Sequence, residues 1–326
     1  MQKINWGIIG CGDVTEIKSG PAFNKVKNSA LVAVMRRDAE KAKDYAKRHN
    51  VPTWYDKASD LINDPKINAI YIATPPSSHE EYTIAATQAG KPVYVEKPMT
   101  LNFDSATRMM NIANQNNVKL VVAHYRRAQP FFKKIKELIN EKAVGDIRFA
   151  KIELYKKPAS QEYLTDPKTL WRVNPSIAGG GLFNDLAPHQ LDLAYYFFGE
   201  IEKASGYATN QAGMYQADDI VAGNILFKSG VLLSGTWCFN VAEQDEKDSF
   251  EITGSEGKIS FSIFGNHEAT VTKNGKTEII SFEIPAHVQQ PMIEKVVEYF
   301  LEDGPNPCSA KDGVEIMRLI DKFTLK

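Results

Sequence analysis

The first third of the chain alternates short apolar runs with segments of helical composition, and this alternation constrains the fold more than any other feature. The apolar runs cover Ile4–Ile9, Leu31–Met35, Ala69–Ala73, Pro92–Val95 and Lys119–Ala123. Continuous runs of this length are typical of strands buried on both faces of a parallel sheet. Helical patterns separate them at Ala39–His49, His79–Ala89 and Asn102–Asn117. The sequence therefore predicts right-handed crossovers and a doubly wound α/β sheet.

The pattern changes after about residue 124. A helix is predicted over Phe131–Lys142, and strand-like runs then follow at Ile147–Tyr155, Ala204–Gln211, Ile220–Phe227, Val231–Phe239, Phe250–Thr253, Lys258–Phe264, Ala269–Lys273 and Thr277–Phe282. Asn274-Gly275 between the last two is a strong hairpin signal. The tail is helical over Val288–Glu302 and Gly313–Phe323. We expect one domain over residues 1–123 and a second, with a mostly antiparallel sheet, over residues 124–326.

Composition narrows the class of protein. The chain has 326 residues, enough for roughly two domains of ordinary size. Lysine and arginine total 39 against 40 aspartates and glutamates, which removes the bulk electrostatic case for nucleic-acid or anionic-membrane binding. The three cysteines have no disulfide-framework or zinc spacing, and we expect no metal site. With neither a signal peptide nor an apolar stretch of membrane length, we expect a cytoplasmic protein.

A glycine pair, Gly10 and Gly12, follows the first predicted strand and precedes a helical stretch. In this context the G-x-G-x-x-G pattern indicates dinucleotide binding, because the glycines allow a tight turn and a close approach of the pyrophosphate. Backbone N–H groups at the helix start, those of Asp13 and Val14, would bind the phosphates. The third position is Thr15 rather than glycine or alanine, which weakens the match. The alternative is a plain strand-to-helix turn.

The second predicted strand ends in Arg36-Arg37-Asp38. An acidic residue at this point binds the ribose of NAD, whereas arginine accommodates the 2′-phosphate of NADP. The two guanidinium groups therefore favour NADP, with NAD as the other possibility. The alternative is a solvated basic helix start with Asp38 as its N-cap.

Four segments together resemble the Gfo/Idh/MocA family of NAD(P)-dependent oxidoreductases along nearly the whole chain. They are Gly7–Gly12, Ala73-Thr74-Pro75-Pro76 with His79, Glu96-Lys97-Pro98, and Gly179–Gly181 through Asp185 to His189. The resemblance implies a Rossmann domain followed by a substrate-binding and oligomerisation domain with a large open sheet. It also implies a sugar or polyol substrate, hydride transfer at a secondary alcohol or ketone, and a homodimer or homotetramer.

The resemblance places three residues in catalytic roles. Lys97 would touch the reacting oxygen, Asp185 would anchor the substrate, and His189 would exchange a proton. On a helix Asp185 and His189 share a face, and histidine titrates near neutral pH. Either Lys97 or His189 can carry the proton. The structural alternatives are an exposed loop lysine, a helix N-cap aspartate and a satisfied core histidine.

The remaining site residues follow from the same motifs. Tyr125 joins the catalytic residues as a substrate-facing side chain, while Glu96 is also expected to support the structure. Trp171 and Arg172 would close over cofactor and substrate, and His79 would open its helix beside the cofactor. The alternatives are an ordinary surface arginine beside a core tryptophan, and a histidine that caps its helix. The full set expected to bind the cofactor is Gly10, Gly12, Asp13, Val14, Arg36, Arg37, Thr74, Pro75, His79, Glu96, Trp171 and Arg172.

Two other functions remain open at this stage. Some members of the family resemble glycosidases that oxidise a sugar transiently with retained NAD, eliminate the aglycone and reduce the ring again. A non-catalytic nicotinamide-binding sensor is the second alternative, and the complete set Lys97, Asp185 and His189 argues against it.

Overall fold

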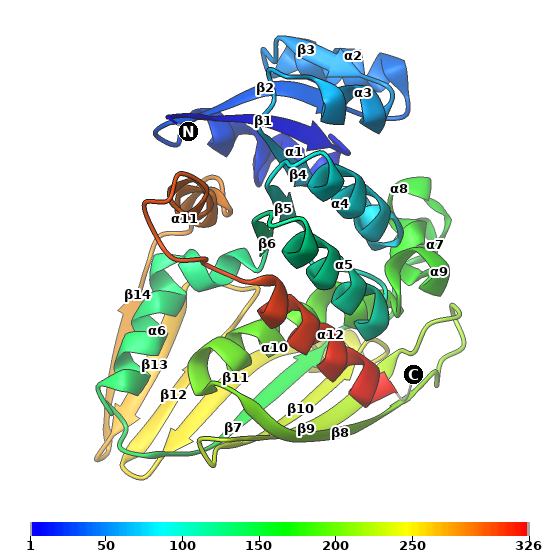
Figure 1. The fold of residues 1–326 in the computed structure, drawn as a ribbon. Helices are drawn as coiled ribbons and strands as arrows, with labels where there is room; N and C mark the ends of the chain where they lie inside the picture. Colours follow the sequence, from blue (N-terminus) through cyan, green and yellow to red (C-terminus); the bar gives the residue numbers. More distant parts are fainter. Residues whose placement is uncertain (1, 325–326) are drawn as a thin grey trace. The chain divides into compact units, whose positions relative to one another are not determined.

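The computed structural model describes residues 2–324, which form two compact units (Figure 1). The first unit comprises the chain up to Gln129 together with Pro285–Met317, and the second comprises Pro130–Ile284 with the residues from Arg318 onward. The expected division between residues 123 and 124 placed all of residues 124–326 in the second domain, whereas the structure groups Pro285–Met317 with the first unit. The difference arises because helix α11 (Gln290–Phe300) packs on the first sheet, where the Phe300 ring lies 5.6 Å from that of Trp6.

The sheet of the first unit is parallel throughout, with strand order β3-β2-β1-β4-β5-β6. Its strands are β1 (Ile4–Ile9), β2 (Ser29–Met35), β3 (Thr53–Tyr55), β4 (Ala69–Ile72), β5 (Val93–Val95) and β6 (Leu120–Val122). The order reverses beside β1, as in a Rossmann fold. The predicted doubly wound sheet is therefore confirmed. The edge strand β3 was not predicted, since Thr53-Trp54-Tyr55 is partly exposed and does not form an apolar run like the other strands of the sheet.

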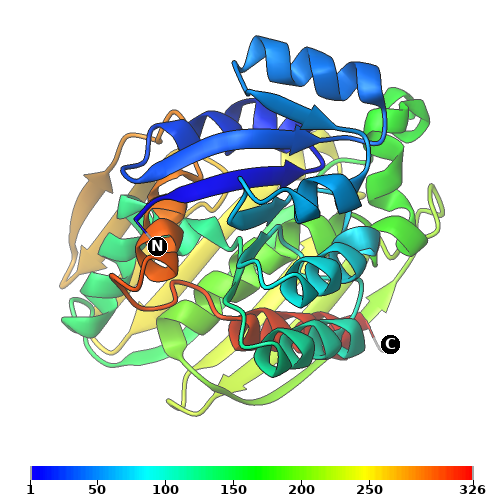
Figure 2. The same ribbon diagram turned by 45° about the horizontal axis from the view of Figure 1, so that its top comes forward.

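Helices cover both faces of this sheet, and Figure 2 shows α4 and α5 side by side. Leu61 of α3 lies over Gly7 of β1, whereas Trp6 packs on Phe23 and Phe300. Consecutive strand residues face opposite sides, so α3 and α11 lie on different faces. The helical segments are α1 (Asp13–Ile17), η1 (Gly20–Asn24), α2 (Ala39–Arg48), α3 (Ala58–Asn63), η2 (Pro76–Ser78), α4 (His79–Gln88), α5 (Phe103–Gln115) and η3 (Tyr125–Ala128).

The second unit is built on a mixed, mostly antiparallel sheet of order β14-β13-β12-β11-β7-β10-β9-β8. Only the β7–β10 pairing is parallel among its ladders in the described residues. Asn274 and Gly275 both have positive φ between β13 and β14, as the hairpin signal predicted. The strands are β7 (Ile147–Tyr155), β8 (Ile201–Thr209), β9 (Ile220–Phe227), β10 (Leu232–Cys238), β11 (Lys247–Gly254), β12 (Gly257–Phe261), β13 (Glu268–Lys273) and β14 (Lys276–Ser281).

One face of this sheet is covered by helices (Figure 1). Phe183 of α10 and Phe323 of α12 both pack against Trp237 of β10, at 5.2 and 6.0 Å between ring centroids. The opposite face carries no helix from the described residues of the second unit (Figure 1) and exposes Phe149, Tyr207 and Leu232. The helical segments are α6 (Pro130–Asn140), α7 (Gln161–Thr165), α8 (Pro167–Leu170), η4 (Trp171–Val173), α9 (Pro175–Ala178), α10 (Gly181–Phe198), η5 (Glu243–Asp245) and α12 (Ala310–Thr324).

A search of the helices in the described part of the chain found none with the length and hydropathy needed to cross a membrane.

Candidate active site

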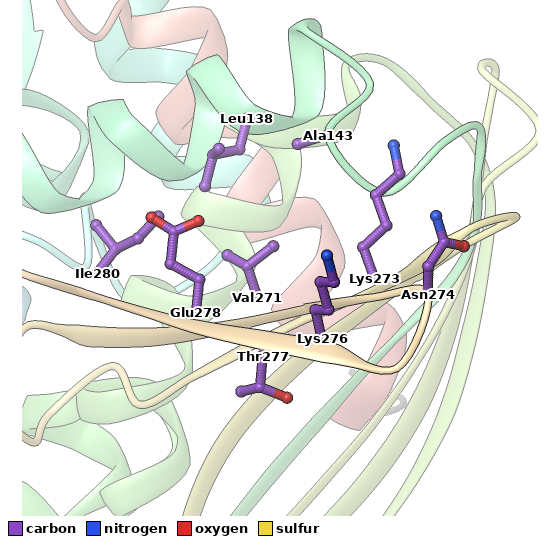
Figure 3. Close-up of a pocket in the computed structure, with 9 residues that line it drawn as sticks. All are labelled: Leu138, Ala143, Val271, Lys273, Asn274, Lys276, Thr277, Glu278 and Ile280. Atoms are coloured by element: carbon purple, nitrogen blue, oxygen red, sulfur yellow. The ribbon is translucent and has the colours of Figure 1, made fainter.

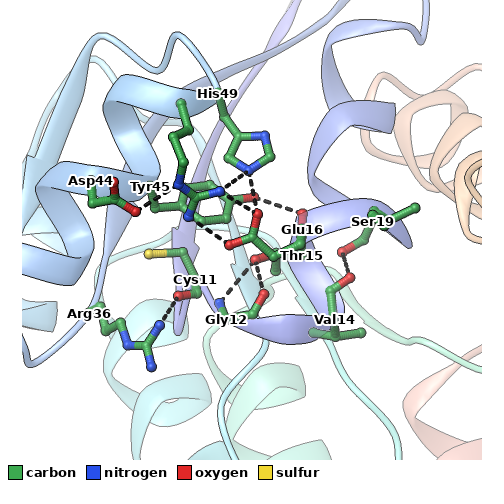
Figure 4. Close-up of polar contacts among 12 residues, drawn as sticks. Cys11, Gly12, Val14, Thr15, Glu16, Ser19, Arg36, Asp44, Tyr45 and His49 are labelled. Atoms are coloured by element: carbon green, nitrogen blue, oxygen red, sulfur yellow. Dashed lines mark hydrogen bonds and ion pairs between the residues drawn. The ribbon is translucent and has the colours of Figure 1, made fainter.

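The glycine loop connects β1 to α1 at the carboxyl end of the strand (Figure 4). Gly10 has φ of +92°, and a Cβ there would lie 2.6 Å from Thr74 Cγ2, so the position requires glycine. A Cβ on Gly12 would meet nothing nearer than the Gly10 carbonyl oxygen at 3.9 Å. There is therefore open space beside the Gly12 backbone, which fits a pyrophosphate. The first-turn amides of Asp13 and Val14 have no intrahelical partners and would bind its oxygens.

Thr15 stabilises this loop instead of impairing it. Its hydroxyl accepts from the Gly12 N–H at 3.0 Å and donates to the Gly12 carbonyl at 2.8 Å. The Thr15 carbonyl in turn accepts from the Tyr45 hydroxyl at 2.8 Å. Gly20, after α1, also requires glycine, because a Cβ there would clash with the Thr15 carbonyl and the Tyr45 hydroxyl. Thr15 is therefore held in place on both its hydroxyl and its carbonyl side.

An ion-pair cluster fixes α1 to the end of α2 (Figure 4). Both oxygens of Glu16 accept from the guanidinium of Arg48, at 2.7 and 2.8 Å, and His49 Nε2 lies 2.7 Å from Glu16 Oε2. Hydrogen bonds from Arg48 lower the pKa of Glu16 to about 2, and His49 acts in the same direction. Burial raises the pKa of the neighbouring Cys11 thiol to about 12, so Cys11 stays protonated at neutral pH.

Arg36 lies at the end of β2, against the same loop. Its Nη1 donates to the Cys11 carbonyl at 3.3 Å, and its side chain is half-buried, while Arg37 is exposed. Asp38 caps α2 by accepting from the Lys41 N–H at 3.1 Å. The N-cap part of the alternative interpretation is therefore present, but Arg36 is held beside the loop and is not part of a freely solvated helix start.

His79 links two loops that carry predicted site residues. Its Nε2 lies 2.7 Å from the Thr74 carbonyl, and its Nδ1 lies 3.1 Å from the Pro98 carbonyl and 3.3 Å from that of Met99. A neutral imidazole donates from one nitrogen only, so either tautomer binds one loop and the protonated ring binds both. Burial lowers the pKa of His79. The ring is 1% exposed, and Thr74 and Pro75 beside it are half-buried.

Lys97 follows β5 at the carboxyl edge of the parallel sheet, where open α/β sheets bind ligands. Its side chain is half-buried, and the peptide bond to Pro98 is cis. The preceding Glu96 is 6% exposed and accepts from the Lys97 N–H at 3.1 Å. Tyr125, at the start of η3, is 6% exposed, and the Arg126 guanidinium lies over its ring.

In the second unit, α10 carries Asp185 and His189. The helix begins at Gly181, so Pro188 lies inside it and removes the bond to the Asn184 carbonyl. His189 is 6% exposed and meets the Phe264 ring edge-on at 5.7 Å. Asp185 is half-buried, one turn before His189 on the same face.

Trp171 and Arg172 lie beside Asp185 rather than on a remote surface. Arg172 Nε is 3.7 Å from Asp185 Oδ2, and the guanidinium stacks over the Trp171 ring at 4.7 Å from its centroid. Burial raises the pKa of the nearby Tyr163, with opposing effects from the charges of Arg172 and Asp185. The segment from α7 to η4 thus places a cation and two aromatic side chains near the carboxylate of Asp185 on α10.

Sequence reasoning missed the residues that support these side chains. Asp248 on β11 accepts from the Phe264 N–H at 2.6 Å and so holds the ring that contacts His189. No motif or spacing marks either residue, because they lie about 60 to 75 positions beyond His189 in sequence. Their roles follow from strand pairing alone.

A separate pocket of about 550 Å³ lies between the end of α6 and the β13–β14 hairpin (Figure 3). Lys273, Lys276 and Glu278 surround an apolar floor that includes Leu138 and Val271. None of the predicted site residues lines it, so we assign it no part in the reaction. Within residues 2–324, no group of three or more His, Cys, Asp or Glu side chains is arranged to hold a metal ion.

Comparison with known proteins places these features in a family. A model described as the oxidoreductase family with an NAD-binding Rossmann fold matches residues 4–124, and the GFO/IDH/MocA C-terminal domain matches residues 132–260. The chain belongs to the Gfo/Idh/MocA family. It is an NAD(P)-dependent dehydrogenase or reductase. The family resemblance that its motifs indicated is therefore confirmed.

Individual members of the Gfo/Idh/MocA family match over most of the chain. Oxidoreductase P35 of Formosa agariphila is 47% identical over 321 residues, covering 98% of each chain. Levoglucosan dehydrogenase of Pseudarthrobacter phenanthrenivorans is 27% identical, covering 83% of this chain and 76% of that protein. A structure of levoglucosan dehydrogenase in complex with NADH aligns with a TM-score of 0.87 at 23% identity, over 99% and 96% of the two chains. This structural likeness confirms the fold.

Proposed function

We propose that this oxidoreductase prefers NADP and transfers hydride between its nicotinamide and a secondary alcohol or ketone of a sugar or polyol. The observation that carries the cofactor preference is Arg36, held 3.3 Å from the Cys11 carbonyl at the end of β2. A guanidinium there suits a 2′-phosphate. The proposed substrate class rests on sequence similarity, since one relative is named 1,5-anhydro-D-fructose reductase and another levoglucosan dehydrogenase.

The chemistry requires a proton to move as hydride moves. The nicotinamide supplies or accepts the hydride, and the protein must stabilise the alkoxide and exchange its proton. We assign Lys97 to the reacting oxygen, His189 to proton exchange and Asp185 to a substrate hydroxyl. Arg172, 3.7 Å from Asp185, forms an ion pair with that carboxylate and would help to orient it toward the substrate. Tyr125 is proposed as a further substrate contact, and Trp171 as a contact to the cofactor.

The experiment is a fluorescence titration with NADPH and NADH side by side, followed by turnover on a panel of ketoses, inosose-type ketones and anhydro sugars. Tight NADPH binding and a reduced sugar product support the proposal. Preference for NADH, or NAD that is bound and does not exchange, contradicts the NADP assignment. Release of an aglycone from a glycoside without net oxidation would favour the glycosidase instead. No turnover on any carbohydrate would contradict the substrate class.

The catalytic roles are tested by Lys97→Ala and His189→Ala. Each is expected to lower kcat by about 100-fold or more, because a general acid or base contributes on that scale. NADPH affinity should change little in both. A variant that keeps full turnover contradicts the role assigned to that residue.

We also propose that the protein works in the cytoplasm as a homodimer or homotetramer. The helix-free face of the second sheet exposes Phe149 at 48%, Leu232 at 56% and Tyr207 at 79%, and the register pairs Leu232 directly with Phe149. Such a surface suits association. Light scattering after size exclusion should give twice or four times the monomer mass, and Phe149→Lys should lower it. A monomer in the unmodified protein contradicts the proposal.

A further inference from the structure

The carboxylate of Glu96 lies at the centre of a buried hydrogen-bond network directly before Lys97. Its Oε1 accepts from the Tyr71 hydroxyl and from Gln289 Nε2, each at 2.5 Å, and its Oε2 accepts from the Lys97 N–H at 3.1 Å. Tyr71 and Gln289 are both 0% exposed. One carboxylate thus connects the backbone of Lys97 to strand β4 and to a segment 193 residues later in the chain.

The orientation of the Gln289 amide is fixed by its other contacts. Its Oε1 accepts from the Tyr94 hydroxyl at 3.1 Å, and its backbone N–H donates to the Lys18 carbonyl at 3.1 Å. An amide whose oxygen is occupied by a hydroxyl donor presents its NH₂ group to the opposite side, which here is Glu96. Gln289 is therefore a dedicated donor to this carboxylate.

A buried carboxylate requires such donors, because an ionised group removed from water costs several kcal/mol unless it is hydrogen-bonded. Burial, followed by the charge of Glu96, raises the pKa of Tyr71 well above its usual value, so Tyr71 remains a donor at any working pH. The donors from Tyr71, Gln289 and the Lys97 amide are all uncharged. They hold the carboxylate in place by directional hydrogen bonds, and that fixes the backbone from which the Lys97 side chain projects.

We propose that Gln289 is a positioning residue for the reaction, acting through Glu96 on Lys97. This inference rests on the proposed role of Lys97. Gln289 lies outside both segments that match the family models, residues 4–124 and 132–260, and no motif marks it. It reaches the Rossmann sheet because α11, which it precedes, packs against Trp6 in the first unit.

The test uses Gln289→Met in the full-length protein, which keeps the length of the side chain and removes its donor and acceptor. The matched control is Gln290→Met, one residue later, where the amide donates to Glu294 Oε1 at 3.2 Å in an exposed hydrogen bond. With NADPH and the best ketone of the panel, kcat of Gln289→Met should fall about tenfold. KM and NADPH affinity should stay within about twofold, and the control should match the parent. Tyr71→Phe, which removes one hydroxyl and keeps the ring packing, should lower kcat in the same direction.

A double-mutant cycle separates positioning from general destabilisation. In a Lys97→Ala background, Gln289→Met should cause no further loss of the residual rate, because the group it positions is gone. An equal fractional loss in both backgrounds would overturn the positioning role, as would unchanged kcat for Gln289→Met beside an inactive Lys97→Ala. If Lys97→Ala itself retains full turnover, the proposed role of Lys97 fails, and the positioning role fails with it.

Discussion

Replacing Arg36 with alanine tests the cofactor assignment most directly. The substitution removes a half-buried guanidinium held beside the glycine loop, where the 2′-phosphate of NADP would lie. A hydrogen bond to a charged group contributes about 1.5 to 3 kcal/mol. At about 1.4 kcal/mol per factor of ten, NADPH affinity should fall by about 12- to 150-fold.

The comparison with NADH isolates the phosphate. Arg36 also donates to the Cys11 carbonyl, and losing that 3.3 Å contact loosens the loop for both cofactors equally. We therefore expect NADH affinity to fall by about fivefold at most, since an ordinary hydrogen bond contributes about 1 kcal/mol net. The measured quantity is the ratio of the two dissociation constants, obtained by nicotinamide fluorescence titration at one salt concentration.

Lys43→Ala is the matched control, because it removes a positive charge from the exposed side of α2 without touching the loop. It should leave both affinities near those of the parent. Equal losses of NADPH and NADH in Arg36→Ala would mean that Arg36 only supports the loop. Unchanged NADPH affinity would refute the phosphate contact outright.

Two further predictions concern the stability of the first unit. Gly10→Ala should destabilise the protein by about 1 to 3 kcal/mol more than Gly90→Ala. Both glycines have positive φ, but of the two only Gly10 has a neighbour, Thr74, within 4 Å of the new Cβ. Equal losses of unfolding free energy in urea would contradict this prediction. Glu16→Gln should cost about 0.5 to 1 kcal/mol at pH 7, after discounting the ion pair with Arg48 for solvent screening. Because the pKa of Glu16 falls from 4.5 to about 2 on folding, this contribution is present above pH 4.5 and fades as the pH approaches 2, so the two unfolding curves should converge there.

Much of the fold could be predicted because its determinants are local. Except for β3, the strands of the parallel sheet lie in short apolar runs, and the β13–β14 hairpin is specified by Asn274 and Gly275, whose positive φ values its turn requires. The candidate site residues could also be named from the sequence, because they lie in the motifs of the family. Their roles in the reaction remain predictions that the variants above will test.

The unpredicted features depend on contacts between distant residues. Gly20 permits close packing after the first helix, because a Cβ there would clash with the nearby Thr15 carbonyl and with the hydroxyl of Tyr45, a residue of α2. The grouping of Pro285–Met317 with the first unit depends in the same way on side chains such as Phe300 meeting Trp6. A periodic pattern shows that a helix has an apolar face, but it does not show which sheet that face covers.

Because local and distant determinants differ in this way, the cofactor preference and the substrate specificity should differ in how many substitutions are needed to change them. The proposed contact for the 2′-phosphate comes from one side chain, Arg36, at the end of a strand that the local sequence specifies. The surroundings of Asp185 and His189 instead combine three separate segments: the helices around Arg172, helix α10 itself, and the loop that carries Phe264. Cofactor preference should therefore respond to a single substitution, whereas a change of substrate should require concerted changes in several segments, since function resides in the site rather than in the fold.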